Sequence, residues 1–84
     1  MNEEKKLLET LLNLLVDDKD KVKVECTVTP RTAVFDIYIG DKDLPVVIGK
    51  EGKYADALRT LLTPIYAKIG KRLHLHVTGW RHKK

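Results

Sequence analysis

The sequence predicts an α+β fold, a two-layer sandwich in which three helices cover one face of a three-stranded sheet. Leucine and valine recur at helical spacing over residues 2–16. Apolar and polar residues alternate, as in half-buried strands, over 22–28, 33–39 and 72–78. Between the second and third strands, a Gly-x-x-Gly loop separates two further helical segments. The chain has 84 residues, which is room for one domain.

The first helix and the first two strands occupy the N-terminal half. A polar run at 17–21 ends the helix, and the first strand follows at once. Thr29-Pro30-Arg31 makes a tight connection to the second strand. That strand places its apolar residues on one face, namely Ala33, Phe35, Ile37 and Ile39.

The two later helices flank the loop at 49–52. Asp43 is suited to cap a short helix, because Pro45 would fall in its tolerant first turn. The longer helix carries apolar residues from Tyr54 to Ile69 and ends at Gly70. Pro64 lies inside it and is expected to kink or split it. A final strand, 72–78, closes the order.

Composition excludes several classes of function. A single cysteine, Cys26, permits neither an intramolecular disulfide nor a zinc site built on several thiolates. His74 and His76 share a strand face without a partner ligand at matched spacing, so we expect no metal and no cofactor. No Ser-His-Asp grouping, paired carboxylates in an apolar setting or Walker loop is present, so we expect no enzyme. Neither a secretory signal nor a membrane span is recognisable, and the cytoplasm is the expected location.

Charge is distributed unevenly along the chain. The net charge of +4 divides into −3 over residues 1–48 and +7 over residues 49–84. A basic C-terminal half indicates a face that attracts polyanions, although ordinary solubilisation explains the asymmetry about as well.

The loop Gly49-Lys50-Glu51-Gly52 carries the most specific chemistry. Two glycines between helix ends let another backbone approach without obstruction by Cβ atoms. The following helix directs free N–H groups and the positive end of its dipole to the same place. Such a geometry binds phosphate, and Lys50 and Lys53 add positive charge.

This loop, with the apolar Val47-Ile48 before it, resembles the signature of the KH domain, which clamps about four nucleotides of single-stranded RNA. VIGKEGKYADALRTLL and GKRLHLHV are similar to the KhpA family of stand-alone bacterial KH proteins. The resemblance implies one type II KH domain over 1–84, α-β-β-α-α-β, with a mixed sheet. It covers about residues 4–78 and leaves 79–84 as a basic tail.

The resemblance also implies function, partners and site residues. It implies a cytoplasmic RNA chaperone or post-transcriptional regulator that forms a homodimer, or a heterodimer with a KhpB-like KH protein. Single-stranded RNA would be held by the loop and an adjoining apolar groove, with the closing strand as the opposite wall. The residues so assigned are Val47, Ile48, Gly49, Lys50, Glu51, Gly52, Lys53, Tyr54, Ala57 and Arg59.

Several alternatives stay open at this point. Tyr54 could stack on a base or pack in the core, and Arg59 could touch RNA or pair with Asp56 or Thr63 along its helix. Glu51 places a negative charge in the loop and predicts weak binding. The KH fold could instead serve as a protein-interaction or dimerisation module with little RNA affinity. The loop chemistry would also admit single-stranded DNA.

Overall fold

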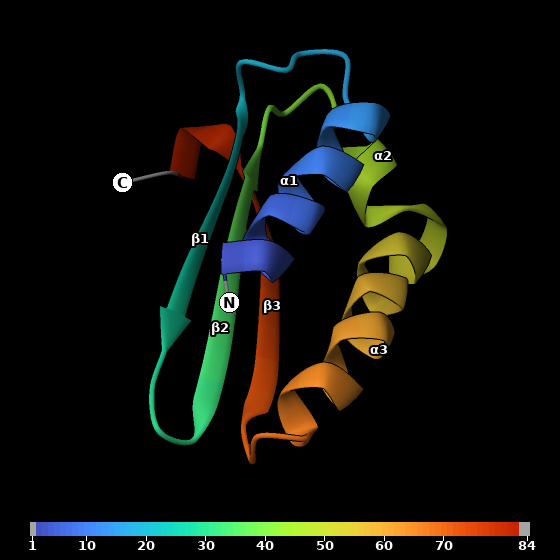
Figure 1. Ribbon diagram of the computed structural model, residues 1–84. Helices are drawn as coiled ribbons and strands as arrows, with labels where there is room; N and C mark the ends of the chain where they lie inside the picture. Colours follow the sequence, from blue (N-terminus) through green and yellow to red (C-terminus); the bar gives the residue numbers. More distant parts are fainter. Residues whose placement is uncertain (1, 83–84) are drawn as a thin grey trace.

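The computed structural model describes residues 2–82, which form two layers (Figure 1). The predicted α+β class and element order are confirmed, and each predicted boundary lies within three residues of the observed one. The elements are α1 (Asn2–Leu15), β1 (Val22–Val28), β2 (Thr32–Ile39), α2 (Leu44–Ile48), the 3₁₀ turn η1 (Lys50–Gly52), α3 (Lys53–Ala67), β3 (Arg72–Gly79) and the 3₁₀ turn η2 (Trp80–His82).

The sheet has the order β1-β2-β3 and is mixed, as expected. β1 pairs antiparallel with β2, and β2 pairs parallel with β3. Phe35 lies opposite both Cys26 and Leu75 in this register. Parallel neighbours need a long crossover, which α2 and α3 supply. β3 is therefore an edge strand, and the crossover that precedes it carries the Gly-x-x-Gly loop.

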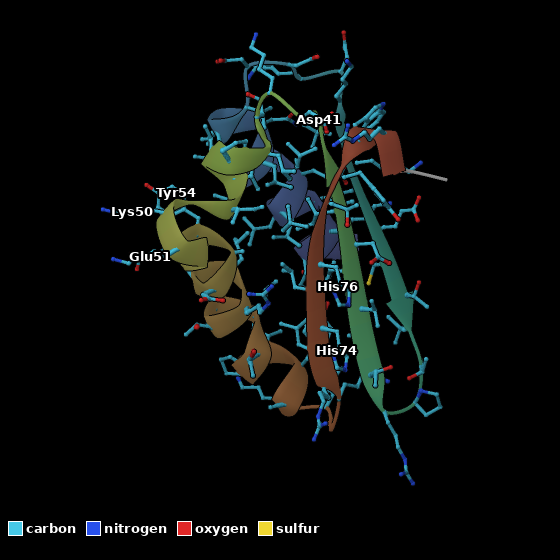
Figure 2. All side chains as sticks on the ribbon, turned by 180° about the vertical axis from the view of Figure 1, so that it is seen from behind. Asp41, Lys50, Glu51, Tyr54, His74 and His76 are labelled. Carbon is cyan, nitrogen blue, oxygen red and sulfur yellow. The ribbon has the colours of Figure 1, made fainter. Side chains whose placement is uncertain are left out.

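The core lies between the sheet and the helices, which all cover the same face (Figure 1). Alternation on β2 directs every second side chain inward, and Phe35 meets Tyr66 of α3 edge-on, with ring centroids 5.8 Å apart. α1 contributes Leu8 and Leu12, each 1% exposed. The opposite face of the sheet is uncovered and carries His74 and His76 (Figure 2).

Asp43 does not cap α2 with its side chain, which corrects the sequence-based prediction. Its carboxylate instead accepts hydrogen bonds from the backbone N–H groups of Asp17 and Asp18, each at 3.0 Å. The two amides follow α1, so this buried carboxylate holds the start of α2 against the end of α1. A charge-assisted pair of bonds outcompetes one local cap.

α3 continues through Pro64 without splitting, so of the two predicted outcomes the split is wrong. The turn that follows α3 contains a left-handed Gly70, with φ of 72°. The N–H of Lys71 donates to the carbonyl of Tyr66 at 3.0 Å, and the N–H of Gly70 donates to that of Ala67. These bonds form a Schellman motif, as the glycine predicted.

The C-terminal tail is ordered further than its composition suggests. Within the predicted basic tail at 79–84, residues 80–82 form η2. Arg81 lies 3.6 Å from the Asp41 carboxylate, which ties this turn to the segment between β2 and α2. Residues 83 and 84 lie outside the described part of the chain.

Candidate nucleic-acid interface

Gly49 makes the bend between α2 and the loop. Its φ of 80° and ψ of 169° lie in a region that essentially only glycine adopts. A Cβ at this position would also lie 2.7 Å from Cγ of Tyr54. Glycine is therefore required here for both backbone conformation and space.

The rest of the loop is open to solvent. Glu51 and Gly52 are both left-handed, with φ of 59° and 76°. The Gly52 N–H donates to the Gly49 carbonyl at 3.1 Å and closes the turn. A Cβ built on Gly52 would meet no atom within 4 Å, so another molecule can approach this backbone closely.

Positive charge and a helix N-terminus meet at this loop. α3 begins at Lys53 directly after Gly52, and this fifteen-residue helix directs the positive end of its dipole there. The N–H groups of Gly52 and Lys53 already donate within the loop, to the carbonyls of Gly49 and Lys50. Lys50, Glu51 and Lys53 are exposed. Figure 2 shows Lys50 and Glu51 pointing away from the body of the protein at the outer edge of the helical layer. The arrangement suits a phosphate group.

Arg59 connects α3 to the edge strand. Its Nη2 donates to the carbonyl of Leu75 on β3 at 3.2 Å, and its Nη1 pairs with the Asp56 carboxylate. The predicted pairing along the helix is therefore present, and the contact with β3 is added to it. The Thr63 hydroxyl donates to the Arg59 carbonyl rather than meeting its side chain.

Some backbone N–H and C=O groups of β3 point to the free edge of the strand, where Arg59 contacts it. The N–H of Arg72 donates to the Arg31 carbonyl just before β2, and the direction of backbone groups alternates along a strand. Leu73, Leu75 and Val77 therefore direct their N–H and C=O groups to the free edge of β3. The Leu75 carbonyl in this row already accepts a hydrogen bond from Arg59. The other donors and acceptors along the free edge can hydrogen-bond the edges of bases.

Tyr54 and Ala57 lie on the other flank of α3, facing α1. They help to line an apolar cavity of about 330 Å³. The Tyr54 side chain is 54% exposed, so it is not a core residue, and it borders both this cavity and Gly49. The other lining residues are Leu11, Leu12, Leu14, Leu15, Val47 and Leu58.

The structure thus divides the predicted site residues into three groups. Residues 48–53 gather at the loop, while Val47 beside them is fully buried and contributes by holding α2 in the core. Tyr54 and Ala57 face α1. Arg59 alone reaches β3.

Sequence analysis missed the contribution of α1 to this region. The leucines and valines at helical spacing predicted the helix itself, but Leu14 and Leu15 are 79% and 43% exposed. The signal was present, because its leucines span an arc wider than a single buried stripe.

A family model described as KhpA/KhpB, KH domain, matches residues 5–77. The chain belongs to this family. It is 44% identical over 73 residues to the RNA-binding protein KhpA of Aquifex aeolicus, with 87% of this chain and 92% of the relative covered. It is 33% identical over 73 residues to the RNA-binding protein KhpA of Clostridium acetobutylicum, with coverage of 87% and 97%. No solved structure matches the chain significantly.

Membership in the KhpA/KhpB family confirms the resemblance and agrees with the expectation that the chain is not an enzyme. Within residues 2–82, no helix combines the length and apolar character needed to cross a membrane. The described residues also hold no cluster of three or more ligands suited to a metal ion.

Proposed function

We propose that the protein binds single-stranded RNA with the loop at residues 49–52 holding the sugar-phosphate backbone. The supporting observation is the open backbone at Gly52, placed at the N-terminus of α3 between Lys50 and Lys53. The relatives named RNA-binding protein KhpA support the same ligand.

Bases held by this loop would lie toward the free edge of β3. Leu73 and Val77 offer backbone donors and acceptors there, and Arg59 offers a guanidinium. The free edge of β3 is therefore the base-contacting surface in this proposal, and the domain has a type II KH arrangement. Tyr54 then takes a different role from base stacking, because it lies on the flank of α3 that faces α1.

The test is RNA binding by a Lys50→Asp/Glu51→Asp variant against wild type, with a mixed single-stranded RNA pool at two salt concentrations. Asp tolerates the left-handed conformation of residue 51, so the loop is expected to fold. Wild type should bind and weaken as salt rises, because phosphate contacts release counterions, and the variant should lose most of this binding.

The control carries the same two substitutions on α1, Lys6→Asp/Glu3→Asp, where both side chains are exposed. It should bind like wild type, and circular dichroism should show all three proteins folded. Equal binding by the loop variant and wild type would remove the loop from the interface. Repeating the titration with single-stranded DNA of the same sequence tests the choice of RNA over DNA.

We also propose that the chain forms homodimers through the flanks of α1 and α3 that face each other across the apolar cavity. Leu61, Ile65 and Ile69 extend this flank along α3 and are 57%, 42% and 55% exposed. On α1, Leu7 and Leu14 are 48% and 79% exposed. Monomeric proteins rarely leave so many large apolar residues together in water, and a small core benefits from added burial. A KhpB-like KH domain is the heterodimer alternative.

Sedimentation velocity on Leu61→Glu and Thr60→Glu variants tests the dimer. Thr60 is the exposed neighbour of Leu61 on α3 and controls for the added charge. Wild type and the Thr60 variant should sediment as dimers, and the Leu61 variant should be monomeric. A monomeric wild type at high micromolar concentration would leave a heterologous partner as the occupant of this surface.

The roles as RNA chaperone or regulator and the cytoplasmic location remain predictions. They follow from the resemblance to stand-alone KH proteins of the KhpA/KhpB family.

A further inference from the structure

A polar cavity of about 570 Å³ lies at the end of the sheet where the β1–β2 and α3–β3 turns meet. Arg31 comes from the first turn, and Arg72 and His74 come from β3. Thr32 and Gly70 complete the lining, which contains no acidic residue. Two arginine residues that line one cavity can form a site for anions, because each guanidinium group offers a planar fork of donors that matches phosphate.

The backbone fixes these two arginines beside each other. The Arg72 N–H donates to the Arg31 carbonyl at 2.8 Å. The hydroxyl of Thr29 accepts hydrogen bonds from the N–H groups of Arg31 and Thr32, which holds the turn. Within residues 2–82, neither guanidinium has an ion-pair partner. Their charge is therefore available to a ligand.

This cavity can be reached from the proposed RNA site by passing around one strand. Leu73 and Leu75 face the helices, whereas Arg72 and His74 lie on the uncovered face of the same edge strand. Side chains two residues apart on a strand are about 6.6 Å apart, a spacing comparable with that of successive phosphates in an extended single strand.

Acidic residues on the uncovered face of the sheet disfavour RNA beside the middle of β3. His76 lies opposite Asp36, and Asp36 lies opposite Glu25, so two carboxylates occupy the middle of the uncovered face. They repel phosphate. An RNA strand that turns around β3 is therefore directed toward Arg31 and Arg72.

We propose that Arg31 and Arg72 form a second phosphate site, which holds nucleotides flanking those gripped by the loop at 49–52. This inference rests on the proposed RNA binding and extends it, because it predicts a footprint longer than the roughly four nucleotides of a KH loop. His74 adds one hydrogen-bond donor at the same cavity.

The experiment compares a four-nucleotide and a twelve-nucleotide RNA of the same mixed composition, binding to wild type and to Arg31→Gln/Arg72→Gln. The length factor is the affinity for the twelve-mer divided by the affinity for the four-mer. It should be larger for wild type than for the variant. The ratio of the two factors cancels the greater number of binding registers on the longer RNA. The slope of log K against log salt for the twelve-mer should fall by about 1.4 in the variant, since each single-strand phosphate contact contributes about 0.7.

The control Lys23→Gln/Lys42→Gln removes the same charge from exposed residues outside this cavity. It should leave the wild-type length factor unchanged. Should the double arginine variant lose its circular dichroism, Arg31→Gln alone removes one exposed turn side chain and should lower the slope by about half as much.

An unchanged length factor in the arginine variant, or an equal loss in the lysine control, would overturn the second site. In either case the four-mer still reports on the loop. Failure of wild type to bind either RNA would instead overturn the proposed function, so the two failures are distinguishable.

Discussion

The Asp43 carboxylate binds the backbone of Asp17 and Asp18, which lie 26 and 25 residues earlier in the chain. Asp43 directly precedes α2, the helix that leads into the loop. Hydrogen bonds from the Asp17 and Asp18 amides lower its pKa below the usual 3.8, because they stabilise the charged form. The folded state therefore binds this proton less readily than the unfolded state. Its contribution to stability is present at neutral pH and is lost as the pH falls through the folded-state pKa.

We predict that Asp43→Asn lowers the melting temperature at pH 7. The asparagine side chain can accept a hydrogen bond from only one of the two backbone N–H groups, because its NH₂ group is a donor and would face the other N–H. The difference between wild type and variant should shrink as the pH falls from about 5 to 2, because wild type loses its carboxylate bonds there. Thermal denaturation across this range measures it. A difference that stays constant with pH would show that the two carboxylate bonds do not stabilise the fold.

Tyr66 is a second residue whose ionisation affects the fold. Burial raises its pKa to about 12, and its hydroxyl has no hydrogen-bond partner among the described residues. The neutral form is favoured in the folded state, so the associated stability is present below pH 10 and is lost as the pH rises from 10 toward 12.

For Tyr66→Phe, we expect a free energy of unfolding at pH 7 that is unchanged or about 1 kcal/mol higher, because a buried unsatisfied hydroxyl is removed. Between pH 10 and 12 wild type should lose stability relative to the variant. Urea denaturation at several pH values measures both effects. A variant clearly less stable at pH 7 would show that the hydroxyl is hydrogen-bonded in solution.

At the scale of elements, the loop at 49–52 contains two glycines with different requirements. Gly49 occupies a conformation open essentially to glycine alone and touches Tyr54, whereas Gly52 has the milder left-handed conformation and open space. Substitution by alanine should therefore separate them.

Gly49→Ala should cost about 3 kcal/mol or displace the loop, and Gly52→Ala should cost about 1 kcal/mol. Urea denaturation of both variants gives the comparison. The Gly49→Ala/Tyr54→Ala double variant should recover only the part due to the Tyr54 side chain, because the Cβ would still lie 2.9 Å from the Tyr54 backbone nitrogen. An equal loss of unfolding free energy at the two positions would mean that the backbone at Gly49 does not require glycine.

Secondary structure could be predicted closely because its signals are local. The alternation of apolar and polar residues predicted both ends of β1. Gly70, a residue typical of helix ends, marked the region where α3 stops. The flanks of α3 were also accessible from sequence, since Tyr54 and Arg59 are about 140° apart around an α-helix. The assignment of both residues to the RNA site stays a prediction.

Contacts between distant segments could not be predicted in the same way. Asp43 has a local capping role available, and only the fold shows that the Asp17 and Asp18 amides lie closer to its oxygens. The bond from Arg59 to the Leu75 carbonyl likewise depends on how α3 crosses β3. Pro64 was expected to kink or split α3, and the helix continues past it without a split.

At the scale of the whole molecule, two surfaces of α3 serve different partners in this account. One flank faces β3 through Arg59, and the other joins α1 in an apolar surface. On the proposed assignment, RNA and a second protein chain would bind together, because neither would occupy the other's flank. The uncovered face of the sheet adds the cavity at Arg31 and Arg72.

The most direct measurement of the central claim is a map of backbone amide shifts in an NMR titration with a short single-stranded RNA. We predict the largest shifts at residues 49–53 and at Leu73, Leu75 and Val77 on β3, with little change at Leu7, Leu14 or Leu61. Shifts confined to the apolar flanks of α1 and α3, or no shifts at all at millimolar RNA, would contradict RNA binding between the loop and the edge of β3.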